Sequence, residues 1–148
     1  MNKSKLHSKL DNFLPIINED FKDFFELEAI VNEIFTKKIE NEFLIDFLKI
    51  FERFPLENNE YFWSILHGIE QIKNFEKELV KSVLFQPSLF GLLMINRLMN
   101  DSIQNIEETN LIDIFKKHMH NQQLANELKE EAVSFYNYQT NKKNEIKT

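Results

Sequence analysis

The sequence predicts an all-α fold, and three observations support this prediction. Apolar residues recur at spacings of three and four through most of the 148-residue chain, which is the period of a helix that buries one face. The periodic segments are rich in Leu, Glu, Lys, Ile and Phe, which suit packed helices. The chain has only two glycines and three prolines. Phosphate-binding loops and tight hairpin turns depend on glycine, so this composition favours helices over β-hairpins and nucleotide-binding folds.

The N-terminal part of the chain predicts two helices. Residues 3–14 form a short helix that ends before Pro15, because the residue preceding a proline is pushed out of the α region. A longer helix begins with Asp20 as its N-cap and extends to about Lys38. Its apolar face consists of Phe21, Phe24, Phe25, Leu27, Ile30, Val31, Ile34 and Phe35.

Two further helices are predicted before residue 73. The first has Asn41 as a candidate cap and stops at Pro55; its face is Phe43, Leu44, Phe47, Leu48, Ile50, Phe51 and Phe54. The second is capped by Asn58 or Asn59, with a face of Phe62, Ile65, Leu66, Ile69 and Ile72. Beside that face, Trp63, His67 and Glu70 form one stripe, because steps of four and three bring side chains together on a helix.

The next two predicted helices meet at Pro87. The first carries Phe75, Leu79, Val80, Val83 and Leu84. Ser88 is the expected N-cap of the second, Leu89–Met99, which is apolar on nearly all sides as far as Ile95. Such a helix has to be covered by others, so we expect it to be central.

The C-terminal third predicts two more helices after a polar connection, Asn100 to Asn110. One carries Leu111, Ile112, Ile114, Phe115 and Met119, capped by Thr109 or Asn110. The last begins near Asn121 and uses Leu124, Leu128, Ala132, Phe135 and Tyr136. Periodicity is then lost, so we expect one helical domain over residues 1–136 and a frayed tail over 137–148.

Short turns between these helices predict antiparallel neighbours. We expect stacked antiparallel helical hairpins of the HEAT-like kind over residues 20–54, 59–85 and 88–119, with Pro55 and Pro87 at the junctions between pairs. An irregular helical bundle is the alternative, since the three segments share little sequence identity.

Composition limits the function. The chain has no cysteine, which excludes disulfides, thiolate nucleophiles and cysteine-ligated metals. Its net charge of −6 makes nucleic acid a poor direct partner. No apolar run reaches the roughly 20 residues that a membrane helix needs. We therefore expect a cytoplasmic protein that does not contact the membrane.

A few polar residues are candidates for a metal site or a catalytic site. His67 and Glu70 have the spacing of metal ligands on helix bundles, but the facing helices offer no further carboxylates. The expected alternative is that His67 packs against Trp63 while Glu70 pairs with a cation such as Arg97. No nucleophile with an orienting acid stands out. We predict no enzyme, no cofactor and no metal site.

One ordered motif resembles a family of bacterial immunity proteins that accompany polymorphic toxins, including contact-dependent growth inhibition systems. It covers about residues 55–101. The matching positions are Trp63-x-x-Leu66-His67-x-x-Glu70, Glu78-Leu79, Pro87, Leu92-Leu93 and Asn96-Arg97-Leu98-x-Asn100.

The resemblance implies a non-enzymatic protein that binds the C-terminal domain of one cognate toxin. Many such toxins are basic nucleases, so acids on the inhibitor would speed association. We expect the contact surface at Glu57, Glu60, Glu107, Glu108 and Asp113. We expect Trp63, His67, Glu70, Asn96, Arg97 and Asn100 to have structural roles. A helical-repeat scaffold or adaptor unrelated to toxins is the alternative.

Overall fold

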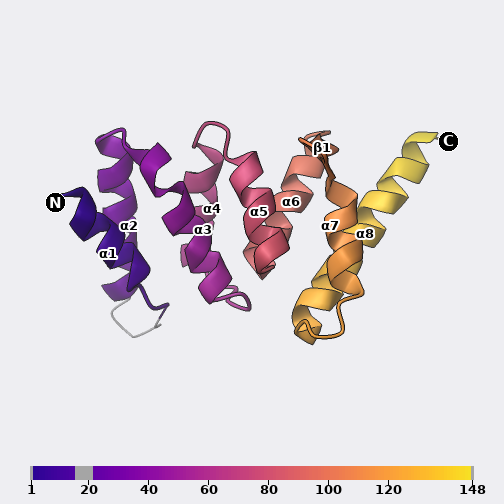
Figure 1. Ribbon diagram of the computed structural model, residues 1–148, viewed down its shortest axis with the longest axis horizontal. Helices are drawn as coiled ribbons and strands as arrows, with labels where there is room; N and C mark the ends of the chain where they lie inside the picture. Colours follow the sequence, from indigo (N-terminus) through magenta and orange to yellow (C-terminus); the bar gives the residue numbers. More distant parts are fainter. Residues whose placement is uncertain (1, 16–21, 148) are drawn as a thin grey trace.

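The structure is a computed structural model that describes residues 2–15 and 22–147, so the predicted cap Asp20 and Phe21 lie outside the described residues. The described chain is all-α, as predicted, apart from one two-stranded hairpin (Figure 1). Its elements are α1 (Lys3–Asp11), α2 (Lys22–Thr36), the 3-10 helix η1 (Glu40–Phe43), α3 (Leu44–Arg53), α4 (Tyr61–Glu70), α5 (Glu76–Phe85), α6 (Leu89–Asn100), β1 (Asn105–Ile106), β2 (Thr109–Asn110), α7 (Leu111–Met119) and α8 (Asn126–Lys147).

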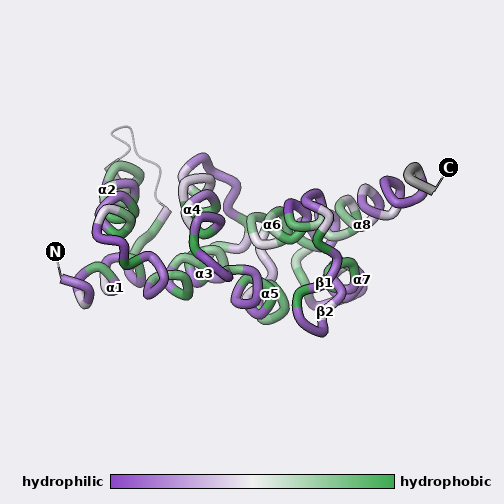
Figure 2. Tube along the Cα trace, turned by 90° about the horizontal axis from the view of Figure 1, so that it is seen from above, coloured by the Kyte–Doolittle hydropathy of each residue, from purple (hydrophilic) through white to green (hydrophobic). Residues whose placement is uncertain are grey.

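The helices stand in two rows. Seen from above, α2, α4, α6 and α8 lie along one side, and α1, α3, α5 and α7 lie along the other (Figure 2). Neighbours within each row pack together, α1 on α3 and α3 on α5, and likewise α2 on α4, α4 on α6 and α6 on α8. From α3 onward, consecutive helices reverse direction (Figure 1). One hydrophobic cluster extends from Leu6 on α1 to Ala132 on α8.

The observed helix pairs are shifted by one helix along the chain from the predicted pairs 20–54, 59–85 and 88–119. The neighbours in sequence that pack most closely are α3 with α4, α5 with α6 and α7 with α8. Pro55 and Pro87 therefore lie in turns within these pairs rather than between them. The two turns touch, since Leu89 N–H donates to the Pro55 carbonyl at 2.8 Å. A proline marks the end of a helix, but it does not say which neighbour that helix packs against.

Helix α6 is central, as its composition predicted. It packs against α3, α4, α5, α7 and α8. Ser88 is its N-cap, and its hydroxyl accepts from Gly91 N–H at 2.8 Å. A Cβ on Gly91 would lie 2.8 Å from the Ser88 hydroxyl and 3.0 Å from a methyl group of Val83. Glycine is therefore required where α5 and α6 approach each other at the start of α6.

Pro87 also shapes the contact between α5 and α7. In a continuing helix the carbonyl of Val83 would accept from the N–H of residue 87, but proline has none. The buried His118 fills this place, with Nε2 donating to the Val83 carbonyl at 2.9 Å. Its Nδ1 is buried without a partner among the described residues. His118 therefore joins α7 to the end of α5.

The N-terminal helix α1 is attached to α3 by polar contacts. Arg53 donates to the carbonyls of Leu10, Asp11 and Phe13 at 2.9, 2.7 and 3.3 Å. These carbonyls lie at and just after the C-terminal end of α1, where the regular hydrogen bonds of the helix stop. His7 on α1 hydrogen-bonds to Asp46 on α3. The predicted cap Asn41 is wrong, since it lies inside η1 and no side chain caps α3.

The connection from α6 to α7 contains a hairpin that the sequence did not predict. β1 and β2 pair antiparallel, and Glu107 in the turn has φ 52°. This left-handed conformation normally favours glycine or asparagine, so the scarcity of glycine did not exclude a hairpin. Asn110 then caps α7, as predicted, by accepting from Ile112 N–H.

The frayed tail predicted for residues 137–148 is also wrong, because α8 continues to Lys147. Gln139 is buried, and its amide donates to Asn96 at 2.7 Å and to Asn100 at 2.9 Å, both on α6. Polar contacts hold this part of α8, and hydrophobic periodicity does not detect such contacts. None of the described helices combines the length and apolar character needed to cross a bilayer.

His118 should make stability depend on pH. Burial lowers its pKa below the ordinary value of 6.5. Below about pH 6.5 the unfolded chain binds a proton that the folded chain does not, so the free energy of unfolding falls as the pH falls, by at most about 1.4 kcal/mol per pH unit from this group. Urea unfolding at pH 7.5 and 5.5 measures the effect.

The matched variant is His118→Gln, which keeps a side-chain N–H donor but does not titrate. It should lose less stability than the wild type between the two pH values. An equal loss in both proteins would show that His118 does not cause the pH dependence.

Candidate functional site

Helix α4 carries a strip of polar and aromatic side chains on its outer side. It lies between α2 and α6, and its apolar side, which includes Phe62, Ile65 and Ile69, is buried. The opposite side carries a strip of exposed and half-buried side chains that we call the α4 ridge: Trp63, Ser64, His67, Glu70 and Gln71. Spacings of three and four place these residues together, as the sequence predicted for Trp63, His67 and Glu70.

Trp63 is only partly buried. The residue is 39% exposed, and its ring meets the ring of the buried Phe90, on α6, edge to face at 5.6 Å between centroids. His67 lies beside it, with ring centroids 5.8 Å apart. The predicted packing of His67 against Trp63 is therefore present, while one side of the tryptophan remains open to a partner.

Glu70 and Arg97 form the ion pair that the sequence predicted. Arg97 Nε and one terminal nitrogen of its guanidinium donate to the two carboxylate oxygens at 2.8 and 2.9 Å. This pair joins α4 to α6 across 27 residues of sequence. The hydrogen bond to Glu70 raises the pKa of Arg97 above its ordinary value. His67 lies at the edge of the pair, with Nδ1 3.8 Å from Glu70.

A metal would have to compete with Arg97 for Glu70. Both oxygens of the carboxylate already accept from the guanidinium. In the part of the chain that the structure describes, no group of three His, Cys, Asp or Glu side chains could hold a metal ion. The geometry favours the ion pair over the metal site that the His67 and Glu70 spacing suggested.

Asn96 and Asn100 have structural contacts. Both amide oxygens accept from Gln139, and Lys142 also donates to Asn100 at 3.4 Å. Their spacing of four residues places them on one side of α6, where α8 packs. The sequence did not indicate Gln139, because it lies in the stretch where apolar periodicity is lost.

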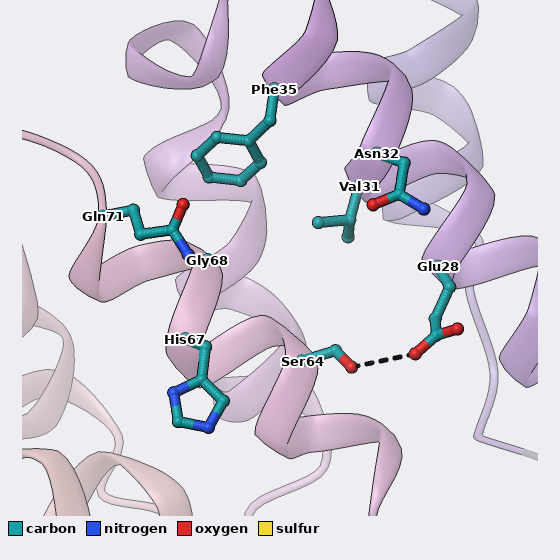
Figure 3. Close-up of a pocket in the computed structure, with 8 residues that line it drawn as sticks. All are labelled: Glu28, Val31, Asn32, Phe35, Ser64, His67, Gly68 and Gln71. Carbon is teal, nitrogen blue, oxygen red and sulfur yellow. Dashed lines mark hydrogen bonds between the residues drawn. The ribbon is translucent and has the colours of Figure 1, made fainter.

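A pocket of about 340 Å³ lies between α2 and α4 (Figure 3). It is lined by Glu28, Val31, Asn32, Phe35, Ser64, His67, Gly68 and Gln71. The Ser64 hydroxyl donates to Glu28 at 3.2 Å across the pocket. A Cβ on Gly68 would lie 3.3 Å from the Phe35 ring, so the glycine permits close packing here. Glycine inside a helix indicates such an approach, but the sequence does not identify the partner helix.

A second, smaller hollow lies at Phe90, the ring that Trp63 contacts. It measures about 90 Å³ and is lined by Asn58, Leu89, Phe90, Leu93, Glu131 and Phe135, from α6, α8 and the turn before α4. Phe90 belongs both to this hollow and to the contact with Trp63. The larger pocket includes Ser64, His67 and Gln71 of the α4 ridge, and the smaller hollow is linked to the ridge through the contact of Phe90 with Trp63.

The five predicted contact acids do not form one surface. Glu57 and Glu60 lie in the turn between α3 and α4, next to Asn58 of the smaller hollow. The other three are exposed at the opposite edge, near the β1–β2 hairpin (Figure 1): Glu107, Glu108 and Asp113. Glu107 also pairs with Lys77 at 3.5 Å. Only Glu57 and Glu60 lie near the ridge.

Four carboxylates that line one of the two pockets or precede α4 have no ion-pair partner within the described ranges: Glu28, Glu57, Glu60 and Glu131. Glu28 and Glu57 accept only neutral hydrogen bonds, from Ser64 and Asn59. With the half-exposed Trp63, they give a surface that is both aromatic and acidic. Tryptophan is enriched in protein–protein interfaces.

Comparisons with protein-family models, with curated proteins and with solved structures find no match to this chain. The resemblance to immunity proteins therefore stays a prediction from the motif residues.

Trp63→Ala should cost about 1–2 kcal/mol of unfolding free energy, because the side chain is only partly buried. The neighbouring Phe62 is fully buried, and Phe62→Ala should cost about 3–5 kcal/mol. Urea unfolding followed by circular dichroism measures both variants. Equal losses in the two variants would show that Trp63 belongs to the core rather than to a binding surface.

Proposed function

We propose that this protein is a cytoplasmic immunity protein that binds the C-terminal domain of a cognate secreted toxin and neutralises it, with the α4 ridge in the contact. The observation that carries the proposal is the half-exposed Trp63 on a surface of carboxylates without cationic partners. The motif that resembles immunity proteins supplies the class of partner. Glu70, Arg97, Asn96 and Asn100 of that motif hold α4, α6 and α8 together and so support the ridge.

The chemistry of the surface favours a basic partner. A nuclease domain is basic because it binds phosphate groups, and an acidic inhibitor attracts it over long range and raises the association rate. The tryptophan adds a large apolar contact that slows dissociation. Binding alone would suffice for inhibition if the complex covers the active site of the toxin.

A helical-repeat scaffold or adaptor is the second candidate. The two-row stack of helices favours it, since stacked helical hairpins provide extended binding surfaces for many kinds of protein. Gene context distinguishes the two candidates, because an immunity gene should directly follow the gene of a large secreted toxin.

Co-expression with the C-terminal domain encoded immediately upstream tests the proposal. That domain alone should stop growth, whereas co-expression with this protein should restore growth and yield a complex that co-purifies. If the domain is harmless, or stops growth despite this protein, the immunity proposal is wrong and the scaffold becomes the first candidate.

Charge reversal locates the contact surface. Glu57→Lys with Glu60→Lys, beside the ridge, should slow association with the toxin domain about tenfold at low salt. Glu107→Lys with Glu108→Lys, at the opposite edge, changes the net charge equally and should slow association much less. Stopped-flow kinetics at two salt concentrations compares them. A larger effect of the second pair would place the contact at the hairpin.

A further inference from the structure

The pocket between α2 and α4 contains a carboxylate that is only partly used. One oxygen of Glu28 accepts from the Ser64 hydroxyl at 3.2 Å, and the other has no hydrogen-bond partner in the described chain. Glu28 is half-buried, and no lysine or arginine lines the pocket. A carboxylate withdrawn from water is stabilised by a cation that donates hydrogen bonds.

The other walls suit a flat cation on an aliphatic chain. The side-chain amides of Asn32 on α2 and Gln71, the C-cap of α4, line the pocket from its two sides (Figure 3), and each amide has an oxygen that can accept a hydrogen bond. Val31 and Phe35 supply apolar surface, and Gly68 adds no side chain to fill the space. The pocket therefore combines a carboxylate, amide oxygens and an apolar wall.

We propose that this pocket receives an arginine side chain of the protein partner, with Glu28 as the counter-ion. A guanidinium has five N–H donors in one plane and binds carboxylates through two parallel hydrogen bonds. Its aliphatic stem can lie on Val31 and Phe35. The proposal rests on the proposed function for the identity of the partner, a basic toxin domain. It accounts for a carboxylate whose partner among the described residues is a neutral hydroxyl.

A small probe tests the pocket without the toxin. The full chain, labelled with 15N, is titrated with N-acetyl-L-arginine amide, and N-acetyl-L-citrulline amide serves as the uncharged control of the same shape. The arginine compound should cause saturable shifts in the backbone amides of Ser64, Gly68 and Gln71. The citrulline compound should bind at least fivefold more weakly. Equal binding of the two compounds, or no shift at these amides, would overturn the proposal.

Glu28→Gln keeps the size of the side chain and removes its charge. This variant should weaken binding of the arginine compound at least fivefold, whereas Glu127→Gln, an exposed acid in the first turn of α8, should not change it. Circular dichroism confirms that both variants fold. Unchanged binding by Glu28→Gln would show that Glu28 is not the counter-ion.

The toxin complex separates this proposal from the proposed function. Glu28→Gln should also weaken the complex with the upstream toxin domain at least fivefold. If the wild type protects cells and Glu28→Gln binds the toxin equally well, the arginine pocket is wrong and the immunity function stands. If the wild type does not protect cells while the arginine compound still binds through Glu28, the immunity function is wrong and the pocket stands.

Discussion

The need to cover α6 on nearly all sides determines how the rest of the chain is arranged. A helix that is apolar around its whole circumference is stable in water only when other helices surround it, and here α3, α4, α5, α7 and α8 do so. Gly91 lets α5 approach the start of α6, and Ser88 caps the helix by accepting a hydrogen bond from Gly91 N–H. The α4 ridge is held on one flank of this arrangement, because Glu70 is bound to Arg97 of α6.

The features that the sequence predicted well are those encoded by local pattern. The helical fold, the central position of Leu89–Met99 and the caps Ser88 and Asn110 follow from periodicity and from side chains that bond to the backbone a few residues away. The pair of Glu70 with Arg97 is long-range, yet it was predictable because a carboxylate beside a core face needs a cation.

The features that the sequence did not predict depend on contacts between distant segments. The pocket joins Glu28 to Ser64 across 36 residues, and no pattern within either helix indicates the other. Helix α8 continues beyond Tyr136 because Gln139 binds two amides of α6, a contact without apolar periodicity. The positive φ of Glu107 is tolerated within the hairpin although its residue type does not favour it. Charge alone likewise could not show that the five predicted acids lie at opposite edges.

The position of Trp63 has a practical consequence. It is the only tryptophan in the chain, and it lies on the surface proposed for binding rather than in the core, with 39% of the residue exposed. The intrinsic fluorescence of this protein therefore comes mainly from one place, on the α4 ridge. Any partner that covers the ridge would change the tryptophan emission and its quenching by acrylamide. Binding at the ridge can therefore be followed by the fluorescence of the unlabelled protein.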